Sequence, residues 1–386
     1  MAKIIHHWKI ERQREIKKLR DEIKNNPKSS ELHFELGRAL IRYFNRDSKR
    51  EGIKYLEKAI KLKTDFAEAM EVLAIEVMKE NPVRGTRLAQ KAASIYMSRG
   101  DIEKTDEILD KAAMHYVYEG WDFLSSGDNI TAKKKAQRAL AIYPHCVDAR
   151  NILASIHMDR FEFEDAERIY KDAIRDAVAK QGGKLKVEGV TYWGSIHTRP
   201  YMRSRHGLGL CYMRLGKFKE ALEEFNTLLD LNPNDNQGVR FLIGDVYYYM
   251  GDIENTARYY RKYGEHEGHY NYALLLYSMK EKSKAIKMLK DSIKDAPFIA
   301  AMLRTYLEMF IFWQERGLYN FGQNPHLFMH RNAVINAWNE NIGLAKDYIT
   351  NHKLESAYDF CNLCGSLWLK VNGSYLFLLE GMDAIA

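Results

Sequence analysis

The residues best suited to chemistry in this chain are cations and aromatics near the middle of the sequence. Residues 177–206 contain six Lys or Arg residues and one acidic residue. The cations are Lys180, Lys184, Lys186, Arg199, Arg203 and Arg205, and the aromatics among them are Tyr192, Trp193 and Tyr201. Cations with interleaved aromatics are typical of sites that bind phosphates or stack bases. The segment therefore predicts an anion-binding site at Lys184, Lys186, Arg199, Arg203 and Arg205, or a loop that its arginines pin to carboxylates of the fold.

Two further residues, Cys361 and Cys364, have the spacing of a metal-binding or redox pair. A structural zinc site needs four ligands, which come from a second such pair or from suitably spaced histidines. The other cysteines, Cys146 and Cys211, lie far away in the sequence, and no histidine completes a known spacing. Because the surrounding segment is apolar with helical spacing, we expect both thiols to pack in the interior and hold no metal.

Signatures of catalysis are missing from the sequence. It contains no glycine loop followed by Gly-Lys-Ser/Thr, no His-Glu-x-x-His zinc motif and no Gly-x-Ser-x-Gly nucleophile turn. We therefore expect a protein that is not an enzyme and that needs no cofactor.

The composition predicts a folded, helical protein. The chain has 386 residues, of which 46% are hydrophobic and 12% aromatic, and this excludes wholesale disorder. Seven prolines favour long helices, and four cysteines exclude a disulfide framework. No apolar run approaches the about twenty residues of a spanning helix, and the charged N-terminus lacks the apolar core of a signal peptide. We expect a cytoplasmic protein without a membrane span.

Small residues, glycines and prolines recur at a fixed spacing, which indicates the elements that position the candidate residues. The clearest copy consists of Gly209, Gly216, Ala221, Phe225, Leu228 and Pro233. A second copy consists of Gly120, Gly127, Ala132, Ala136, Ala139 and Pro144. The next copy begins with Ala154, which follows Gly120 at an offset of 34 residues. Repetition at this period predicts an array of stacked units.

This period and pattern resemble the tetratricopeptide repeat family. The resemblance implies two amphipathic helices per unit, with a small residue at the eighth position packing against one at the twentieth. Glycine at the fifteenth position would end the first helix with a positive φ, and proline near the end of the unit would stop the second helix. The residues in that last position are Pro27, Pro144, Pro233 and Pro297.

The repeats predict an all-α, right-handed superhelical solenoid of about eight helix pairs. We place a basic N-terminal capping helix at 1–28, five units at 29–176, an inserted loop at 177–200, three units at 201–297 and a C-terminal helical cap at 298–386. The block from 187 to 297 is similar to poorly characterised prokaryotic tetratricopeptide proteins and, distantly, to the suppressor-of-tumorigenicity repeat family. That resemblance implies an interaction protein without catalytic residues.

In this family the first helix of each unit lines a concave groove. The residues at matching positions are Arg203, His206, Arg214, Phe241, Tyr248, Tyr249, Tyr270 and Tyr277, with Trp121 and Asn151 upstream. Aromatics with arginines at one end suit an extended peptide or helix that bears acidic groups. The alternative is that these aromatics pack between helices. The Lys and Asn positions with which some relatives clamp a C-terminal carboxylate are not matched.

The N-terminal helix is basic as well, because residues 1–24 have eight Lys or Arg residues and four acidic ones. Its apolar stripe suits either a membrane surface or the first repeat, and the interspersed acids favour packing on the repeat. This helix and the 177–206 segment together account for the net charge of +7, which leaves the rest of the chain near neutral.

The sequence predicts a non-catalytic scaffold or adaptor that holds a partner protein or peptide in the groove. Two alternatives stay open. One is binding of nucleic acid or another polyanion through the 177–206 insertion, and the other is a role as an accessory or regulatory subunit of a larger enzyme complex. The sequence does not indicate an oligomeric state.

Overall fold

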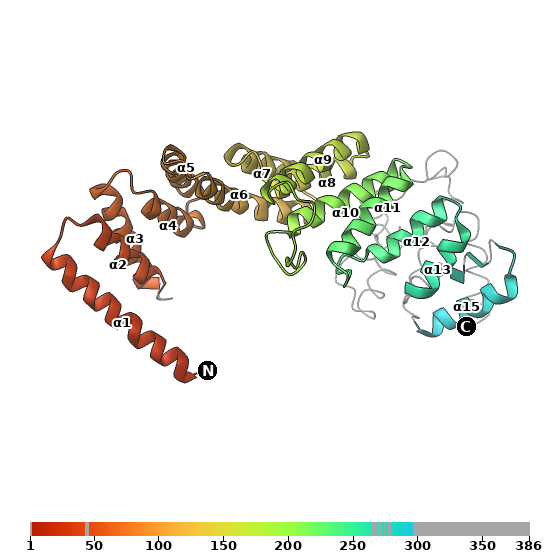
Figure 1. The fold of residues 1–386 in the computed structure, drawn as a ribbon, viewed down its shortest axis with the longest axis horizontal. Coiled ribbons are helices and arrows are strands. Elements are labelled where there is room, and N and C mark those ends of the chain that lie inside the picture. Colours follow the sequence, from red (N-terminus) through yellow and green to blue (C-terminus); the bar gives the residue numbers. More distant parts are fainter. Residues whose placement is uncertain are drawn as a thin grey trace, which may run out of the picture. The chain divides into compact units, whose positions relative to one another are not determined.

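The computed structural model describes residues 2–42, 46–263, 269, 272–273, 275–276 and 279–295. The chain falls into two compact units, residues 1–208 and residues 209–386. Within the described residues every regular element is an α-helix, and most successive helices are joined by short turns (Figure 1). The predicted all-α architecture of paired helices is confirmed.

The first unit begins with a single helix, and helix pairs follow it along the chain. Its helices are α1 (Ala2–Asn25), α2 (Ser30–Ile41), α3 (Arg46–Leu62), α4 (Ala67–Met78), α5 (Pro82–Ser98), α6 (Ile102–Ser125), α7 (Asn129–Ile142), α8 (Val147–Asp159) and α9 (Phe163–Lys180). Helix α10 (Arg199–Arg214) begins in this unit and ends in the second. The second unit continues with α11 (Phe218–Leu231), α12 (Val239–Tyr249), α13 (Ile253–Tyr263) and α15 (Lys282–Asp295).

Small residues allow the two helices of a pair to cross closely. In the first pair, a Cβ atom added to Gly37 of α2 would lie 2.9 Å from the carbonyl oxygen of Gly52 in α3. In the pair α10–α11, a Cβ atom on Gly209 would lie 2.4 Å from Cε1 of the fully buried Phe225. Contacts this short leave no room for a larger side chain, so the small residue at the eighth position sets the distance between the helices.

A continuous apolar cluster of the first unit extends from α4 to α8, and separate clusters lie between α1 and α4. The α4–α8 cluster combines many alanines with larger side chains such as Tyr96, Ile108 and Ile152, each of which is at most 1% exposed. Each pair therefore buries its apolar face against the next pair. At about 25 cal/mol per Å² of apolar surface, this contact between neighbours is the main source of stability in such an array.

Most turns inside the described pairs contain a left-handed residue. Gly127, Gly216 and Gly251 have a positive φ in such turns, whereas the α4–α5 turn has no such residue, and Gly100, also with a positive φ, lies between α5 and α6. The unit formed by α8 and α9 has Phe161 instead, and this residue adopts φ 61°. Because a Cβ atom clashes in this conformation, the turn holds Phe161 in a strained backbone geometry.

The boundaries of two expected units differ from the prediction. The unit around Ala93 and the unit around Gly120 were expected to have separate helices, but α6 continues without interruption from Ile102 to Ser125. The segment between Ala112 and Gly120 contains no proline or glycine, so nothing stops the helix there. Helices α5 and α6 each belong to two of the expected units, and the structure pairs α4 with α5 and α6 with α7.

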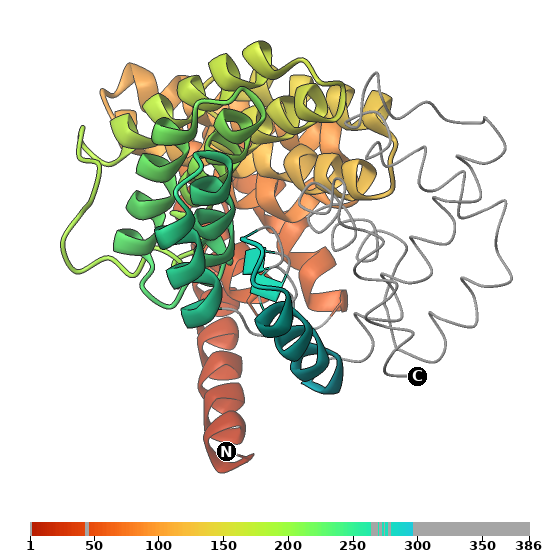
Figure 2. The ribbon, with the colours of Figure 1, turned by 90° about the vertical axis from the view of Figure 1, so that its right-hand side faces the viewer.

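Helix α1 packs against the first pair, as the sequence favoured. Ile16 is 8% exposed and contacts the cluster of Leu36, Ala39 and Leu40, and Leu19 and Ile23 pack beside it. Arg20 also pairs with Glu51 of α3 over 2.8 Å. The N-terminal end of α1 extends away from these helices (Figures 1 and 2).

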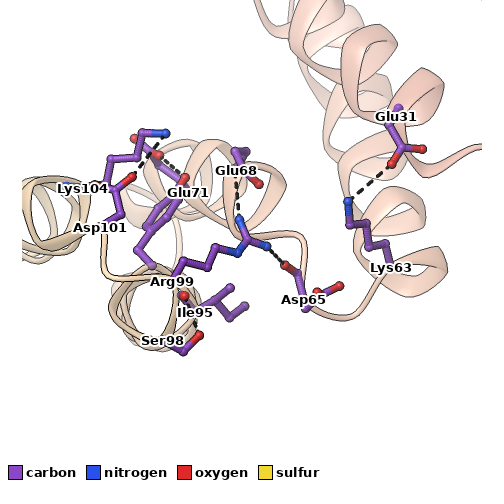
Figure 3. Close-up of polar contacts among 11 residues, drawn as sticks. Glu31, Lys63, Asp65, Glu68, Glu71, Ile95, Ser98, Arg99, Asp101 and Lys104 are labelled. Atoms are coloured by element: carbon purple, nitrogen blue, oxygen red, sulfur yellow. Dashed lines mark hydrogen bonds and ion pairs between the residues drawn. The ribbon is translucent and has the colours of Figure 1, made fainter.

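Polar contacts join the two helices of the pair α4–α5 (Figure 3). At the end of α5, Arg99 donates from Nη2 to the carbonyl oxygen of Asp65 over 2.7 Å and from Nη1 to Glu68 over 3.1 Å. Tyr96 donates its phenolic proton to Glu71 over 2.9 Å, and burial raises the pKa of Tyr96. These contacts join the end of α5 to α4 and to the turn before it, so they fix the spacing of neighbouring helices.

The inserted loop is shorter than the predicted 177–200, because α9 continues to Lys180 and α10 begins at Arg199. Two buried tyrosines hold the loop. The phenol of Tyr192 donates to Gln181 and accepts from the backbone N–H of Val187, and the phenol of Tyr201 donates to the carbonyl oxygen of Leu185. The loop nevertheless projects from the helices (Figure 2). The predicted cap at 298–386, with Cys361 and Cys364, lies outside the described residues.

Because Phe161 has a positive φ, we predict that glycine stabilises this position more than alanine does. Replacing Phe161 by Gly or by Ala removes the same contact with Phe163, where the ring centroids are 5.9 Å apart. The Gly variant should nevertheless be more stable than the Ala variant by about 1 kcal/mol, because only Gly adopts a positive φ without a clash. Chemical denaturation of both variants measures the difference, and an Ala variant as stable as the Gly variant contradicts the strain.

Candidate functional site

Five side chains from three helices meet at one place in the first unit. They are Trp121 of α6, Asp148 and Asn151 of α8, and Arg203 and Ser204 of α10, and we call them the Arg203 cluster. Each of these helices is the first of its pair, so the cluster lies on the side of the unit that such helices line. Residues far apart in the sequence come together because consecutive first helices pack side by side.

An ion pair organises the cluster. Arg203 Nε lies 3.4 Å from Oδ1 of Asp148, and Arg203 Nη2 lies 3.3 Å from Oδ2. The Asp148 side chain is 2% exposed, whereas the Arg203 side chain is 38% exposed. The guanidinium carbon of Arg203 also lies 5.8 Å from the centre of the Trp121 ring, a cation–π distance. The buried carboxylate thus holds a cation at the surface in a fixed orientation.

A buried hydrogen-bond network supports the ion pair. Asn151 Nδ2 donates to Oδ1 of Asp148 over 3.1 Å and to the carbonyl oxygen of Pro200 over 2.9 Å. Ser204 donates to Oδ1 of Asn151 over 2.7 Å. Asn151 and Ser204 are at most 1% exposed. Because fully satisfied buried polar groups allow few alternative arrangements, the network fixes the start of α10 against α8.

Burial raises the pKa of the Asp148 carboxyl, and the charge of Arg203 and the hydrogen bond from Asn151 oppose this shift. The carboxylate is therefore costly to hold inside the unit without its cation. The ionised form depends on Arg203, and the position of Arg203 depends on the carboxylate.

One edge of the Arg203 guanidinium is open. The group has five N–H donors, and Nε and Nη2 face Asp148. Within the described part of the chain, Nη1 has no hydrogen-bond or ion-pair partner. An arginine with two nitrogens already oriented is well placed to accept a further carboxylate or phosphate on the open edge.

The other predicted anion-binding residues are separated by the fold. Arg199 donates from Nε to the carbonyl oxygen of Trp193 over 3.0 Å and stacks on the Trp193 ring at 5.3 Å. Arg205 is buried and lies 4.9 Å from the centre of the Tyr201 ring. Lys184 and Lys186 are exposed on the loop. Arg203 thus pairs with a carboxylate, as the pinned-loop alternative predicts, whereas Arg199 contacts a backbone carbonyl and an indole ring.

Four of the predicted groove residues lie in the second unit. Arg214 and Phe241 are exposed, and Tyr248 and Tyr249 are half-buried. Tyr249 stacks on Phe218 with ring centroids 5.7 Å apart, and Tyr248 meets it edge-on at 5.8 Å. Burial raises the pKa of Tyr249, and the charge of Arg214 opposes this shift. Tyr249 therefore serves partly as a packing residue, whereas Phe241 offers its ring to solvent.

The remaining predicted residues contribute less to a definable site. His206, which follows the cluster on α10, is half-buried. Tyr270 and Tyr277 lie outside the described residues. In the second unit the buried Tyr260 donates to Asp245 over 2.8 Å. Burial and the nearby Asp245 carboxylate raise the pKa of Tyr260, as expected for a structural contact.

Sequence analysis missed Asp148 and Ser204. Asp148 occupies the second position of its unit, as Arg203 does in the unit that follows the insertion. Two opposite charges at the same position of consecutive units signal an ion pair between adjacent helices. The inserted loop obscured this signal, because it places 55 residues between the two partners.

Among the described residues there is neither a metal-binding cluster nor a membrane-spanning helix. In this part of the chain, no three or more His, Cys, Asp or Glu side chains are arranged to hold a metal ion. In the same residues, no helix is both long enough and apolar enough to cross a bilayer.

Two tetratricopeptide repeat models match the chain, at residues 119–181 and at residues 203–235. The first match includes Trp121, Asp148 and Asn151, and the second includes Arg203 and Ser204. The Arg203 cluster therefore lies on segments that the repeat family itself describes.

Among curated proteins, the type IV pilus assembly protein PilF of Pseudomonas aeruginosa is 26% identical over 188 residues, which cover 45% of this chain and 74% of PilF. The Protein CTR9 homolog of Arabidopsis thaliana is 24% identical over 164 residues. That match covers 36% of this chain and only 15% of the plant protein, so the chain spans a small part of this relative.

Among solved structures, the chain is similar to the APC/C hetero-tetramer Cut9–Hcn1 and to YrrB, described as a TPR protein with an unusual peptide-binding site. The first match has a TM-score of 0.33 and 15% identity, and it covers 73% of this chain and 46% of that chain. The second has a TM-score of 0.30 and 14% identity, and it covers 57% of this chain and 94% of YrrB.

The ion pair predicts energetic coupling between Asp148 and Arg203. In a double-mutant cycle of Asp148→Asn and Arg203→Gln at neutral pH, we expect a coupling free energy of about 1 kcal/mol, because Asp148 is buried and Arg203 is partly solvated. The exposed pair Asp165–Arg168, with side chains 53% and 64% exposed, is the matched control and should couple by under about 0.5 kcal/mol. Equal coupling of the two pairs contradicts the assignment.

The raised pKa of Asp148 predicts a pH dependence. The folded chain binds the proton of the Asp148 carboxyl more tightly than the unfolded chain does, because the pKa of an aspartate carboxyl in the unfolded chain is about 3.9. The stability contribution of Asp148 therefore falls as pH rises from the unfolded pKa through the raised folded pKa. Relative to Asp148→Asn, the wild-type chain should gain stability on acidification through this window. Denaturation midpoints at several pH values test this, and a constant difference between the two chains contradicts it.

Proposed function

We propose that this tetratricopeptide-repeat protein is a non-catalytic scaffold that binds a partner protein or peptide on the face that carries the Arg203 cluster. The observation that carries the proposal is the arrangement of Arg203 itself. A buried carboxylate and an indole ring hold its guanidinium at the surface with one edge open. Such pre-orientation reduces the entropy lost when a partner binds, which is a common property of binding hot spots.

The chemistry of this face supports a partner with acidic and apolar side chains. The open edge of Arg203 suits a carboxylate, and the Trp121 ring suits an apolar side chain beside it. Ile75 of α4 occupies the position in its unit that Trp121 occupies in α6, and it is 43% exposed. An extended peptide or an amphipathic helix along these first helices would place apolar groups on Ile75 and Trp121 and an acidic group on Arg203.

In the second unit, Arg214, Phe241, Tyr248 and Tyr249 are proposed as a further partner-contacting surface. Phe241 is 49% exposed, which supports a contact role for this residue. Within the described residues Arg214 has no hydrogen bond or ion pair. An exposed aromatic ring and an exposed arginine are residue types enriched at protein interfaces.

A role in an assembly also agrees with the relatives of the chain. PilF is named as a pilus assembly protein, and this chain covers 74% of its length. By analogy, the partner here would be a component of a larger assembly. We propose the cytoplasm as the location, because Cys146 and Cys211 are both buried as free thiols.

The test is affinity capture from the native cell with the tagged full-length chain, followed by quantitative mass spectrometry. The double substitution Arg203→Gln with Trp121→Ala should deplete a specific partner by about 30-fold, as expected for a hot spot of about 2 kcal/mol. The matched control is Arg175→Gln, which removes an exposed α9 cation that pairs with Asp172. A partner recovered equally with all three chains contradicts the proposal.

A further inference from the structure

Charge is divided unequally between the two helices of each pair in the first half of the chain. The first helices α2, α4 and α6 have net charges of −1, −3 and −4, counted from their Asp, Glu, Lys and Arg residues. The second helices α3, α5 and α7 have net charges of +3, +3 and +4. The negative first helices and the positive second helices nearly cancel in net charge, and each of the second helices α3, α5 and α7 is basic.

Two of the three basic helices contain no acidic residue, and α3 contains three acidic residues against six cations. Helix α5 contains Arg84, Arg87 and Lys91 and no acid, and α7 contains four cations and no acid. In α3, Glu51 and Glu57 pair with Arg20 and Arg84. Most of the cations on these helices therefore have no carboxylate beside them.

Eight of these cations are exposed and form no ion pair or side-chain hydrogen bond within the described residues. They are Arg50, Lys54, Lys58 and Lys61 on α3, Arg87 and Lys91 on α5, and Lys134 and Arg138 on α7. Their spacing is close to four residues within each helix, so they share the outer side of the helix. We call these exposed rows of cations, one on each of the three helices, the basic outer face.

Helix α9, the second helix of the next pair, does not have an excess of unpaired cations. It has five acidic residues and four cations, for a net charge of −1. Arg168, Lys171 and Arg175 each pair with an acid three or four residues away. The basic outer face therefore ends before α9, although α5, α7 and α9 all follow one edge of the ribbon in Figure 1.

We propose that the basic outer face of α3, α5 and α7 binds the phosphate backbone of duplex nucleic acid without reading its sequence. Unpaired cations at intervals of about 6 Å along a helix, four residues apart, can neutralise successive phosphates. Five of the eight residues of the face are lysines, point charges that bind phosphate without strict geometry. The uncharged, exposed Gln90, Ser94 and Gln137 add hydrogen-bond donors of the kind that contact phosphate oxygens.

The composition of the face distinguishes this ligand from the other polyanions. None of the residues of α3, α5 and α7 is an exposed aromatic, so bases of a single strand have no ring on which to stack. Exposed apolar side chains such as Val83, Met97 and Ile130 lie near the ends of the helices. A protein interface needs an apolar centre and is depleted in lysine, so an acidic protein is a poorer fit than a duplex.

The test uses a mixed-sequence 20-base-pair duplex with a fluorescent label, and it measures anisotropy with the full-length chain over a series of salt concentrations. The wild-type chain should bind, with log affinity falling linearly with log salt. The variant Lys58→Gln, Arg87→Gln, Lys91→Gln, Lys134→Gln should bind at least 10-fold more weakly. The magnitude of its salt slope should fall by about 3 to 4, close to about 0.9 per lost phosphate contact.

A matched control removes the same number of charges elsewhere. The variant Arg168→Gln, Lys171→Gln, Arg175→Gln, Lys184→Gln should bind within about 3-fold of the wild-type chain, because three of these cations are already paired. Both quadruple variants replace exposed residues by a good helix former, and circular dichroism melting checks that both remain folded.

Four results would overturn the proposal. One is an absence of duplex binding by the wild-type chain at low salt. Another is an equal loss of affinity in the control variant, which would show a net-charge effect without a defined surface. The third is displacement of the duplex by polyglutamate at an equal concentration of charges, which would assign the face to an acidic protein segment. A loss caused by Lys184→Gln with Lys186→Gln alone would likewise place the binding on the inserted loop.

Discussion

The close crossing of two helices at a small residue is the constraint on which the rest of this structure depends. Gly37 and Gly52 approach so closely that a single added carbon would strike the facing backbone, and Gly209 lies against the buried ring of Phe225. Each crossing sets the distance between the helices of a pair. The pair then presents a fixed apolar face to the next pair, so one local contact, repeated, generates the array.

The regular array determines where charge can be placed. In each pair of the first half, the first helix carries the acids and the second helix carries the cations, and only part of this charge is neutralised by pairs such as Arg99–Glu68. The fold therefore gives the unit two chemically different sides. One side offers an oriented arginine with apolar neighbours, and the other offers a row of unpaired cations.

In the Arg203 cluster, the packing of first helices brings together residues that are far apart in the sequence. Asp148 alone would be an unfavourable buried charge, and Arg203 alone would be a mobile surface cation. The buried network through Asn151 and Ser204 brings them together across the inserted loop. The loop, which the sequence suggested as a binding element, is fastened to α10 by the hydrogen bond from Tyr201 to Leu185 and is closed by the hydrogen bonds of Tyr192.

The sequence by itself determined the helical character, the period, the positive φ of turn glycines such as Gly127 and Gly216, and the packing of α1, because each follows from local spacing and residue type. It also named Arg203 and Trp121, which the structure brings together. Only the tertiary structure decided that α6 is one continuous helix, that Asp148 pairs with Arg203, and that Arg205 is buried while Arg203 stays partly exposed. Those outcomes depend on contacts between residues that are tens of positions apart, and no local pattern encodes such contacts.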